Sequence, residues 1–160
     1  MTAEELNQAG QEAIYAKDYG KAMEYYQLAA GKGNAEAFSN IAMIYFLGEG
    51  VEQDFAKALE CYQKGAELGD VEAMYNLGVM YYFGRGTEKD YSKAYECWLL
   101  PAEQGIPEAR FGLGECCYLG LGVEKDLDKA AEWYRKALEA GYVPEETDQE
   151  HLKDVLGEND

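Results

Sequence analysis

Apolar and small residues recur every three or four positions along most of the chain, which is the spacing of one face of an α-helix. One such series is Phe55, Ala58, Leu59, Tyr62 and Ala66. No alternating run rich in Val, Ile and Thr competes as a β-strand. The pattern therefore predicts an all-α protein. The expected helices span residues 3–16, 18–31, 34–47, 54–68, 70–83, 90–104, 107–119, 126–140 and 147–156.

The helical pattern repeats with a fixed period of 36 residues. The phrases DYGKA, DFAKA, DYSKA and DLDKA begin at Asp18, Asp54, Asp90 and Asp126. Glycines and aromatic residues follow the same period: Gly33, Gly69, Gly105 and Gly141; Tyr26, Tyr62, Trp98 and Tyr134. A strict period of this length is typical of stacked structural repeats. We infer that a unit of two helices has been duplicated within the chain.

Residues suited to helix ends mark each unit. The Asp of each phrase is expected to act as an N-cap, because its carboxylate can accept from free amides of the first turn. Asn34 and Asp70 take this role for the other helix of a pair, and Pro107 fits a first helical turn. Thr147 and Glu150 predict a capping box for the last helix. Glycine pairs that suit tight loops separate the helices: Gly48 and Gly50, Gly84 and Gly86, Gly120 and Gly122.

The 160 residues are expected to form one repeat domain, in which each hairpin buries its apolar face against its neighbours. The polar first helix and the charged last helix are suited to cap the two ends, which indicates a complete array. The predicted parts are a first hairpin at 1–33, repeats at 34–69, 70–105 and 106–141, and a C-terminal capping helix within 142–160.

The residue order LGxxYxxGxGVxxDxxKAxxWYxKAAxxG resembles the Sel-1-like repeats, which are relatives of the tetratricopeptide repeat. The best match runs from Leu77 to Ala94, and a second runs from Leu113 to Tyr134. The first hairpin is too short between Gly10 and Ala22 for the Gly-x-Gly loop, so it resembles an ordinary tetratricopeptide repeat. The resemblance implies a right-handed superhelix of about four helix-turn-helix repeats, with first helices lining a concave face. It also implies a scaffold or adaptor role.

The chain is strongly acidic, with 31 Asp and Glu against 14 Lys and Arg and a net charge of −17. Such a field repels phosphate backbones and anionic membranes, so neither nucleic acid nor a membrane is expected as a ligand. The carboxylates either form a solvated outer face that keeps the protein soluble or attract a basic peptide. The polar N-terminus and the absence of an apolar run of about 20 residues predict a cytoplasmic protein, which we expect to be a monomer.

Catalytic chemistry is not indicated. The only histidine, His151, lies in the last predicted helix, so no Cys–His or Ser–His–Asp set is expected. The segment Gly48–Glu49–Gly50 lacks the Lys and Ser/Thr of a phosphate-binding loop. We therefore predict a non-enzyme without cofactor or metal. Four cysteines are expected as core thiols, and four periodic carboxylates as surface positions: Cys61, Cys97, Cys116 and Cys117; Glu24, Glu60, Glu96 and Glu132.

Transferring tetratricopeptide geometry through the resemblance predicts which residues face a partner in the concave groove. These are Asn40, Met43, Phe46, Tyr75, Asn76, Val79, Tyr82, Phe111 and Glu115. The aromatic and Met side chains suit binding anchors, although inter-repeat packing is an equally good explanation for about half of the aromatics.

Asn40 and Asn76 are the sharper part of this prediction. They fall where peptide-binding tetratricopeptide domains hold an amide, and an Asn side chain can pair with a peptide's amide and carbonyl together. The cations that hold a terminal carboxylate in such domains are missing, since the corresponding positions are Asn7, Glu72 and Asn76. A basic or apolar-anchored peptide or protein segment is therefore the expected partner, and not an acidic tail.

Two alternatives to a scaffold stay open. The resemblance leaves room for a weak hydrolase-type enzyme, which a deep pocket holding carboxylates of shifted pKa would favour. The other alternative is a structural subunit whose groove is filled by a second copy or a partner chain. A separate local prediction concerns Pro101, whose ring should kink its helix or end it early.

Overall fold

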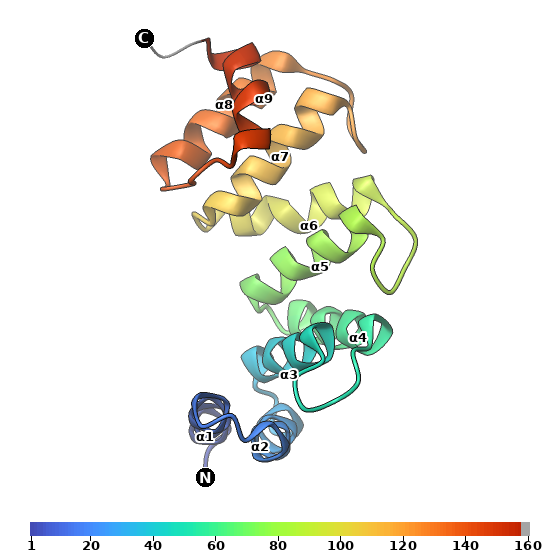
Figure 1. The fold of residues 1–160 in the computed structure, drawn as a ribbon, viewed down its shortest axis with the longest axis vertical. Coiled ribbons are helices and arrows are strands. Elements are labelled where there is room, and N and C mark those ends of the chain that lie inside the picture. The colour runs from blue at the N-terminus through green and yellow to red at the C-terminus, as the bar shows by residue number, and fades with distance from the viewer. Residues whose placement is uncertain (158–160) are drawn as a thin grey trace. The chain divides into compact units, whose positions relative to one another are not determined.

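The structure is a computed structural model that describes residues 1–157. Within these residues the chain forms nine helices and no strand, which confirms the all-α prediction (Figure 1). The helices form four helix-turn-helix repeats followed by one further helix. Their bounds are α1 Ala3–Tyr15, α2 Tyr19–Gly31, α3 Ala35–Leu47, α4 Phe55–Glu67, α5 Val71–Phe83, α6 Tyr91–Glu103, α7 Pro107–Leu119, α8 Leu127–Glu139 and α9 Glu146–Leu156. The predicted capping segment 142–160 extends into residues 158–160, which lie outside the described part.

The predicted N-caps are confirmed. The carboxylate of each periodic Asp accepts from the backbone amide three residues later, at 3.1 Å for Asp18 and at 3.0 Å for Asp54, Asp90 and Asp126. Asn34 does the same for α3 at 2.8 Å. Because each cap satisfies an amide that has no partner inside the helix, the caps fix where each helix begins.

Two local predictions were wrong. The capping box was expected at Thr147 and Glu150, but α9 begins earlier, because Asp148 accepts from the backbone amide of Glu145 at 2.9 Å. Pro101 was expected to kink its helix or end it early; the early end is wrong, because α6 runs to Glu103 and has the same 13 residues as the helices before it, while the kink stays a prediction. Pro101 lies in the last turn of α6, so its missing amide removes only one bond near the end of the ladder.

The helices belong to two compact units. The first unit is Met1–Lys89 and holds α1 to α5, and the second begins at Asp90 and holds α6 to α9. Within the first unit consecutive helices pack together and α3 also packs on α5. Within the second unit α7 packs on α6 and α8, and α9 packs on α8. The single-domain organisation and its boundaries stay predictions.

Each unit has its own apolar core. In the first unit, Tyr26, Ile41 and Ile44 are buried together. In the second unit the core includes Phe111, Tyr134 and Leu152. Cys116 and Cys117 are buried, Cys61 and Cys97 are half-buried, and all four thiols are free, as the prediction of core thiols requires. The four periodic carboxylates Glu24, Glu60, Glu96 and Glu132 are exposed. None of the helices in residues 1–157 combines the length and apolar character that a membrane crossing needs.

Glycine lets two helices of a hairpin approach closely. A Cβ at Gly10 would lie 2.4 Å from the ring of Tyr26, and one at Gly114 would lie 2.5 Å from the ring of Tyr134. No side chain fits at such distances. The buried aromatic ring of each second helix therefore rests directly on the backbone of the first helix, which fixes the spacing of α1 to α2 and of α7 to α8.

In two of the Gly-x-Gly loops, the backbone of the second glycine lies close to the backbone of another helix. Gly86 has φ +72°, and a Cβ there would lie 2.4 Å from the carbonyl oxygen of Phe55. Gly122 has φ +69°, and its Cβ would lie 2.4 Å from the carbonyl carbon of Tyr91. Each loop is thus seated on the first turn of the second helix of the preceding repeat. The first hairpin lacks this loop, because only Ala16 to Asp18 separate α1 from α2.

We expect Gly122→Ala to destabilise the second unit by about 3 kcal/mol, since it adds a backbone clash to the cost of a positive φ. Gly141→Ala is the matched control: Gly141 has φ +96° but nothing within 4 Å of its Cβ position. The control should lose only about 1–2 kcal/mol. Urea unfolding of the two variants beside the wild type measures the difference, and equal losses would contradict a seated loop.

Candidate functional site

Seven of the nine predicted partner-binding residues lie on two adjacent helices of the first unit. They form what we call the α3–α5 face: Asn40, Met43, Phe46, Tyr75, Asn76, Val79 and Tyr82. All seven are half-buried. The face therefore offers aromatic and apolar surface that is held in place by packing but still reaches the solvent.

The two asparagines of the face differ. The Asn40 amide nitrogen donates to the side-chain oxygen of Asn7 at 2.9 Å, and Asn7 is buried. No hydrogen bond joins the side chain of Asn76 to another residue in the described range. Asn40 thus ties α3 to α1, whereas the Asn76 amide keeps its full hydrogen-bonding capacity. The prediction that both amides clamp a peptide backbone stays untested, and Asn76 is the better suited of the two.

We expect Asn40→Ala to lower the free energy of unfolding by about 1–2 kcal/mol, because the buried oxygen of Asn7 loses its donor. Asn76→Ala should change it by less than about 0.5 kcal/mol. Chemical unfolding of both variants checks the contrast. Equal changes in the free energy of unfolding would show that the Asn7–Asn40 hydrogen bond does not stabilise the fold.

Three carboxylates lie beside this face, at the N-terminal ends of α3 and α5. We call Glu36, Asp70 and Glu72 the acidic rim. The Gln11 amide donates to Glu36 at 2.8 Å, and the Ser39 hydroxyl donates to Asp70. Burial raises the pKa of Glu72 above its usual value, and the charges of Asp70 and Glu36 add to this shift.

Because the pKa of Glu72 is raised, keeping its carboxylate ionised beside Asp70 and Glu36 costs the folded protein free energy. The Lys–carboxylate pairs found within the described residues, Lys57–Asp54 and Lys93–Asp90, lie at the starts of α4 and α6. A cation from a partner would relieve the repulsion among the carboxylates of the acidic rim.

We expect Glu72→Gln to stabilise the protein at pH 7. The folded-state pKa of Glu72 is raised, so its ionisation costs stability as the pH rises through that pKa. Glu72 is only partly buried, with more than a third of its surface exposed, so solvent screening limits the gain to about 0.5 kcal/mol, and the gain should shrink toward lower pH and at high salt. Urea unfolding over a pH series measures this, with the exposed outer residue Glu60→Gln as control. A gain that is independent of pH and salt would contradict the repulsion.

The other end of the α3–α5 face carries an aromatic cluster. Phe46 packs on Phe55 with ring centroids 5.3 Å apart. The Arg85 guanidinium lies 5.3 Å from the Phe46 ring and 5.1 Å from the Phe83 ring. Met43 is in reach of the Tyr62 hydroxyl, with 4.0 Å between oxygen and sulfur. Phe46 and Met43 therefore contribute to packing inside the unit as well as to its surface.

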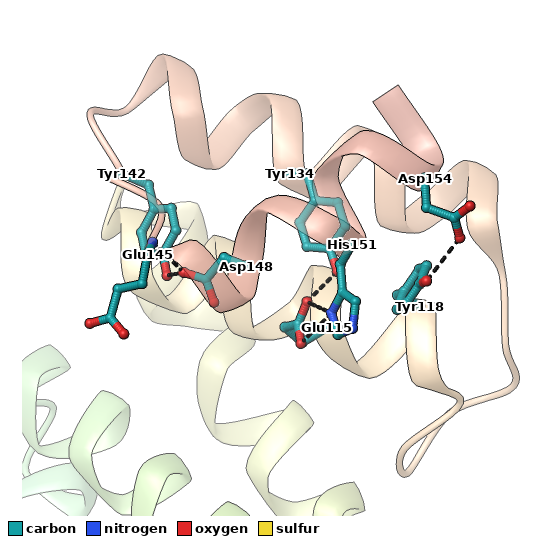
Figure 2. A network of polar contacts seen from close by, with 8 residues as sticks. All are labelled: Glu115, Tyr118, Tyr134, Tyr142, Glu145, Asp148, His151 and Asp154. Atoms are coloured by element: carbon teal, nitrogen blue, oxygen red, sulfur yellow. Dashed lines mark hydrogen bonds and ion pairs between the residues drawn. The ribbon is translucent and has the colours of Figure 1, made fainter. Parts of the chain in front are cut away.

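The remaining two predicted residues, Phe111 and Glu115, lie on α7 in the second unit and are covered. Phe111 is 8% exposed and stacks on Tyr142 at 4.3 Å and on Tyr134 at 5.1 Å. Glu115 accepts from the Tyr134 hydroxyl, and its two oxygens lie 2.9 and 3.0 Å from Nδ1 of His151. Figure 2 shows this carboxylate joined by dashed lines to the side chains of both Tyr134 and His151. Helix α9 and the segment before it thus lie over both residues.

Sequence reasoning missed this network, although the period contains its signal. His151 stands 36 residues after Glu115, and Asp154 stands 36 residues after Tyr118. The repeat register thus continues into α9, where the residue types no longer match. Composition alone gave His151 no role because the chain has no second histidine to pair with it.

The ionisation of the thiols argues against nucleophilic chemistry. Burial raises the pKa of the Cys97 thiol to about 11 and that of the Cys116 thiol to about 12. A thiol with such a pKa is protonated at neutral pH and is a poor nucleophile. A depression in the second unit, lined by Tyr95, Cys117 and Lys129 among others, holds no histidine. The arrangement is suited to binding more than to reaction.

Comparisons with known proteins agree on the fold and the repeat type. A model described as Sel1 repeat matches four times, at residues 3–34, 35–70, 71–106 and 107–142. No curated protein matches the chain.

Solved structures give the same result. A protective antigen of uropathogenic Escherichia coli strains, which displays an SLR fold, is 31% identical with a TM-score of 0.85. The alignment covers 95% of this chain and 33% of the antigen. A Sel1 repeat protein from Oxalobacter formigenes is 28% identical with a TM-score of 0.80, over 88% of this chain and 60% of that one. The chain thus spans about a third and three fifths of these two relatives.

The likeness extends to a smaller protein. Cysteine rich protein B of Helicobacter pylori is 22% identical with a TM-score of 0.59, over 83% of this chain and 93% of that one. At this identity the match shows a shared fold and nothing further.

Proposed function

The chain belongs to the Sel1 repeat family, within the tetratricopeptide-like superfamily, and on that premise we propose that it is a non-enzymatic docking module for a protein or peptide segment. Proteins with such repeats commonly mediate protein interactions, and the fold is usually non-catalytic. The chain covers only a third of the protective antigen that it resembles, so the role of that protein is not transferred here.

The observation that carries the proposal is the combination found on the α3–α5 face. Half-buried aromatic and apolar side chains lie beside three carboxylates, and partial burial, together with the charges of Asp70 and Glu36, raises the pKa of Glu72. Aromatic side chains give large contact area with little loss of conformational entropy. A partner segment with a cation for the acidic rim and an apolar anchor for the face fits both features.

The residues of the α3–α5 face would have different roles in binding the partner. The Asn76 amide pairs with the backbone of the partner, and Val79 offers apolar contact between the two aromatic positions. Tyr75 and Tyr82 already interact with other residues of the protein, and their aromatic rings would serve as anchors for the partner. Anchors that are held in place before binding lower its entropic cost.

The charge of the chain supports the choice of partner. At −17 the protein repels nucleic acid and attracts basic segments, and added salt weakens that attraction. A cytoplasmic location and a monomeric state belong to the same proposal.

The proposal is tested by selecting a displayed random-peptide library on the wild-type protein and then measuring synthetic copies of the enriched peptides. We expect enrichment of Lys or Arg close to an aromatic or aliphatic residue. Binding should weaken between about 50 mM and about 500 mM salt. Asn76→Ala and Tyr82→Ala should each weaken binding by about fivefold or more.

A matched control is available on the opposite helices. Gln27→Ala and Glu60→Ala change exposed positions of α2 and α4 and should leave peptide affinity unchanged. Unfolding curves of all variants exclude a folding defect. Peptides that bind wild type and the Asn76→Ala/Tyr82→Ala variant equally would place the binding surface elsewhere. Affinity that appears only with dimer formation would favour self-association instead.

A further inference from the structure

The repeat register identifies a counterpart of the α3–α5 face on α7. Phe111, Glu115 and Tyr118 stand 36 residues after Tyr75, Val79 and Tyr82. We call these three residues the α7 face. Two of them are among the residues predicted to contact a partner. Phe111 is buried whereas its counterpart Tyr75 is half-buried, and a later segment of the same chain contacts all three residues of the α7 face.

Helix α9 makes its polar contacts to this face. Nδ1 of His151 lies 2.9 and 3.0 Å from the two oxygens of Glu115, and the imidazole ring lies 4.3 Å from the ring of Tyr118. One turn further along α9, Asp154 accepts from the Tyr118 hydroxyl at 2.8 Å. Figure 2 shows these side chains pointing toward one another from α7 and α9.

Helix α9 buries little apolar surface. Leu152 is the one buried residue among Glu146–Leu156, whereas α7 has six buried residues. The segment before α9 adds the stacking of Tyr142 on Phe111 and a bond of 2.7 Å from the Tyr142 hydroxyl to Asp148. A helix with so little buried apolar surface opens locally at low cost, so its polar contacts decide how firmly it docks.

We infer that α9 is an intramolecular occupant of the α7 face, and that the proton on the His151 imidazole sets how tightly it docks. The role of this face as a partner surface rests on the proposed function, while the docking of α9 does not. With α9 in place, Phe111 and Glu115 cannot meet a partner. With α9 released, the fourth repeat presents the same kind of face as α5.

The direction of the effect follows from the groups around His151. Glu115 and Tyr118 face it from α7, and Tyr134 of α8 reaches it only through Glu115. The charged residues Asp128, Glu132 and Arg135 of α8 line a separate depression with Asp154. The remaining charges are Lys125, whose ammonium lies 5.8 Å from the centre of the Tyr118 ring, and those of α9 itself: Glu146, Asp148, Glu150, Lys153 and Asp154.

The protonated imidazole therefore forms an ion pair with Glu115 in a mostly acidic surrounding, whereas the neutral ring keeps a hydrogen bond to that carboxylate but loses the ion pair. Imidazole is the side chain that changes its charge between about pH 5 and 8. Docking should thus be tighter at the acid end of this range, and the α7 face should open as the pH rises. A partly exposed pair of this kind gives a modest effect.

Hydrogen exchange of the full chain tests this without any partner. After correction for intrinsic rates, we expect the amides of α9 to exchange about fivefold faster at pH 8 than at pH 5.5. His151→Gln should remove this difference, because its amide keeps a hydrogen bond but does not titrate. Lys153→Gln, at an exposed position of the same helix, should keep it. Since His151 is the only histidine, its imidazole NMR signals report its protonation directly.

Two results would overturn the inference. One is equal protection of α9 at both pH values in the wild type, and the other is an unchanged pH dependence in His151→Gln. Glu115→Gln gives a second check that should also flatten the dependence. The outcome is independent of the peptide selection on the α3–α5 face, so a failure of the proposed function and a failure of this docking switch are told apart.

Discussion

The structure depends on a close approach of backbone to backbone that only glycine permits. A buried ring of α2 or α8 rests on a glycine of its partner helix, and the loop glycines sit on the first turn of the preceding second helix. These contacts fix the helix spacing inside a hairpin and the seat of the next loop. Direct contacts then position the surface side chains of the first unit: Gln11 donates to Glu36, Ser39 donates to Asp70, and Phe46 packs on Phe55.

Much of this frame could be predicted from the sequence because it rests on local rules. A cap such as Asp54 needs only the amide three residues later, and a period of 36 residues needs only comparison of the chain with itself. The start of α9 could not be predicted in this way. It depends on the hydrogen bonds that Asp148 accepts from Glu145 and Tyr142. The Tyr142 side chain is in turn positioned by its packing on Phe111.

The candidate site was predicted in part for the same reason. The residue types of the α3–α5 face follow from helical spacing and from the family resemblance. The different surroundings of Asn40 and Asn76 do not, because the Asn7–Asn40 bond joins helices 33 positions apart in the chain. The early helix end expected at Pro101 came from a rule for helix interiors, whereas Pro101 lies in the last turn of α6, where the loss of one amide matters little.

The register of α9 has a consequence for how such chains change in length. Because His151 and Asp154 fall one full period after the α7 residues that they contact, α9 takes the place that the first helix of another repeat would take. A further two-helix repeat inserted between α8 and α9 would offer α9 the same kind of first-helix surface that α7 offers it now. The number of repeats before α9 could then change by gene duplication without the need for a new kind of interface.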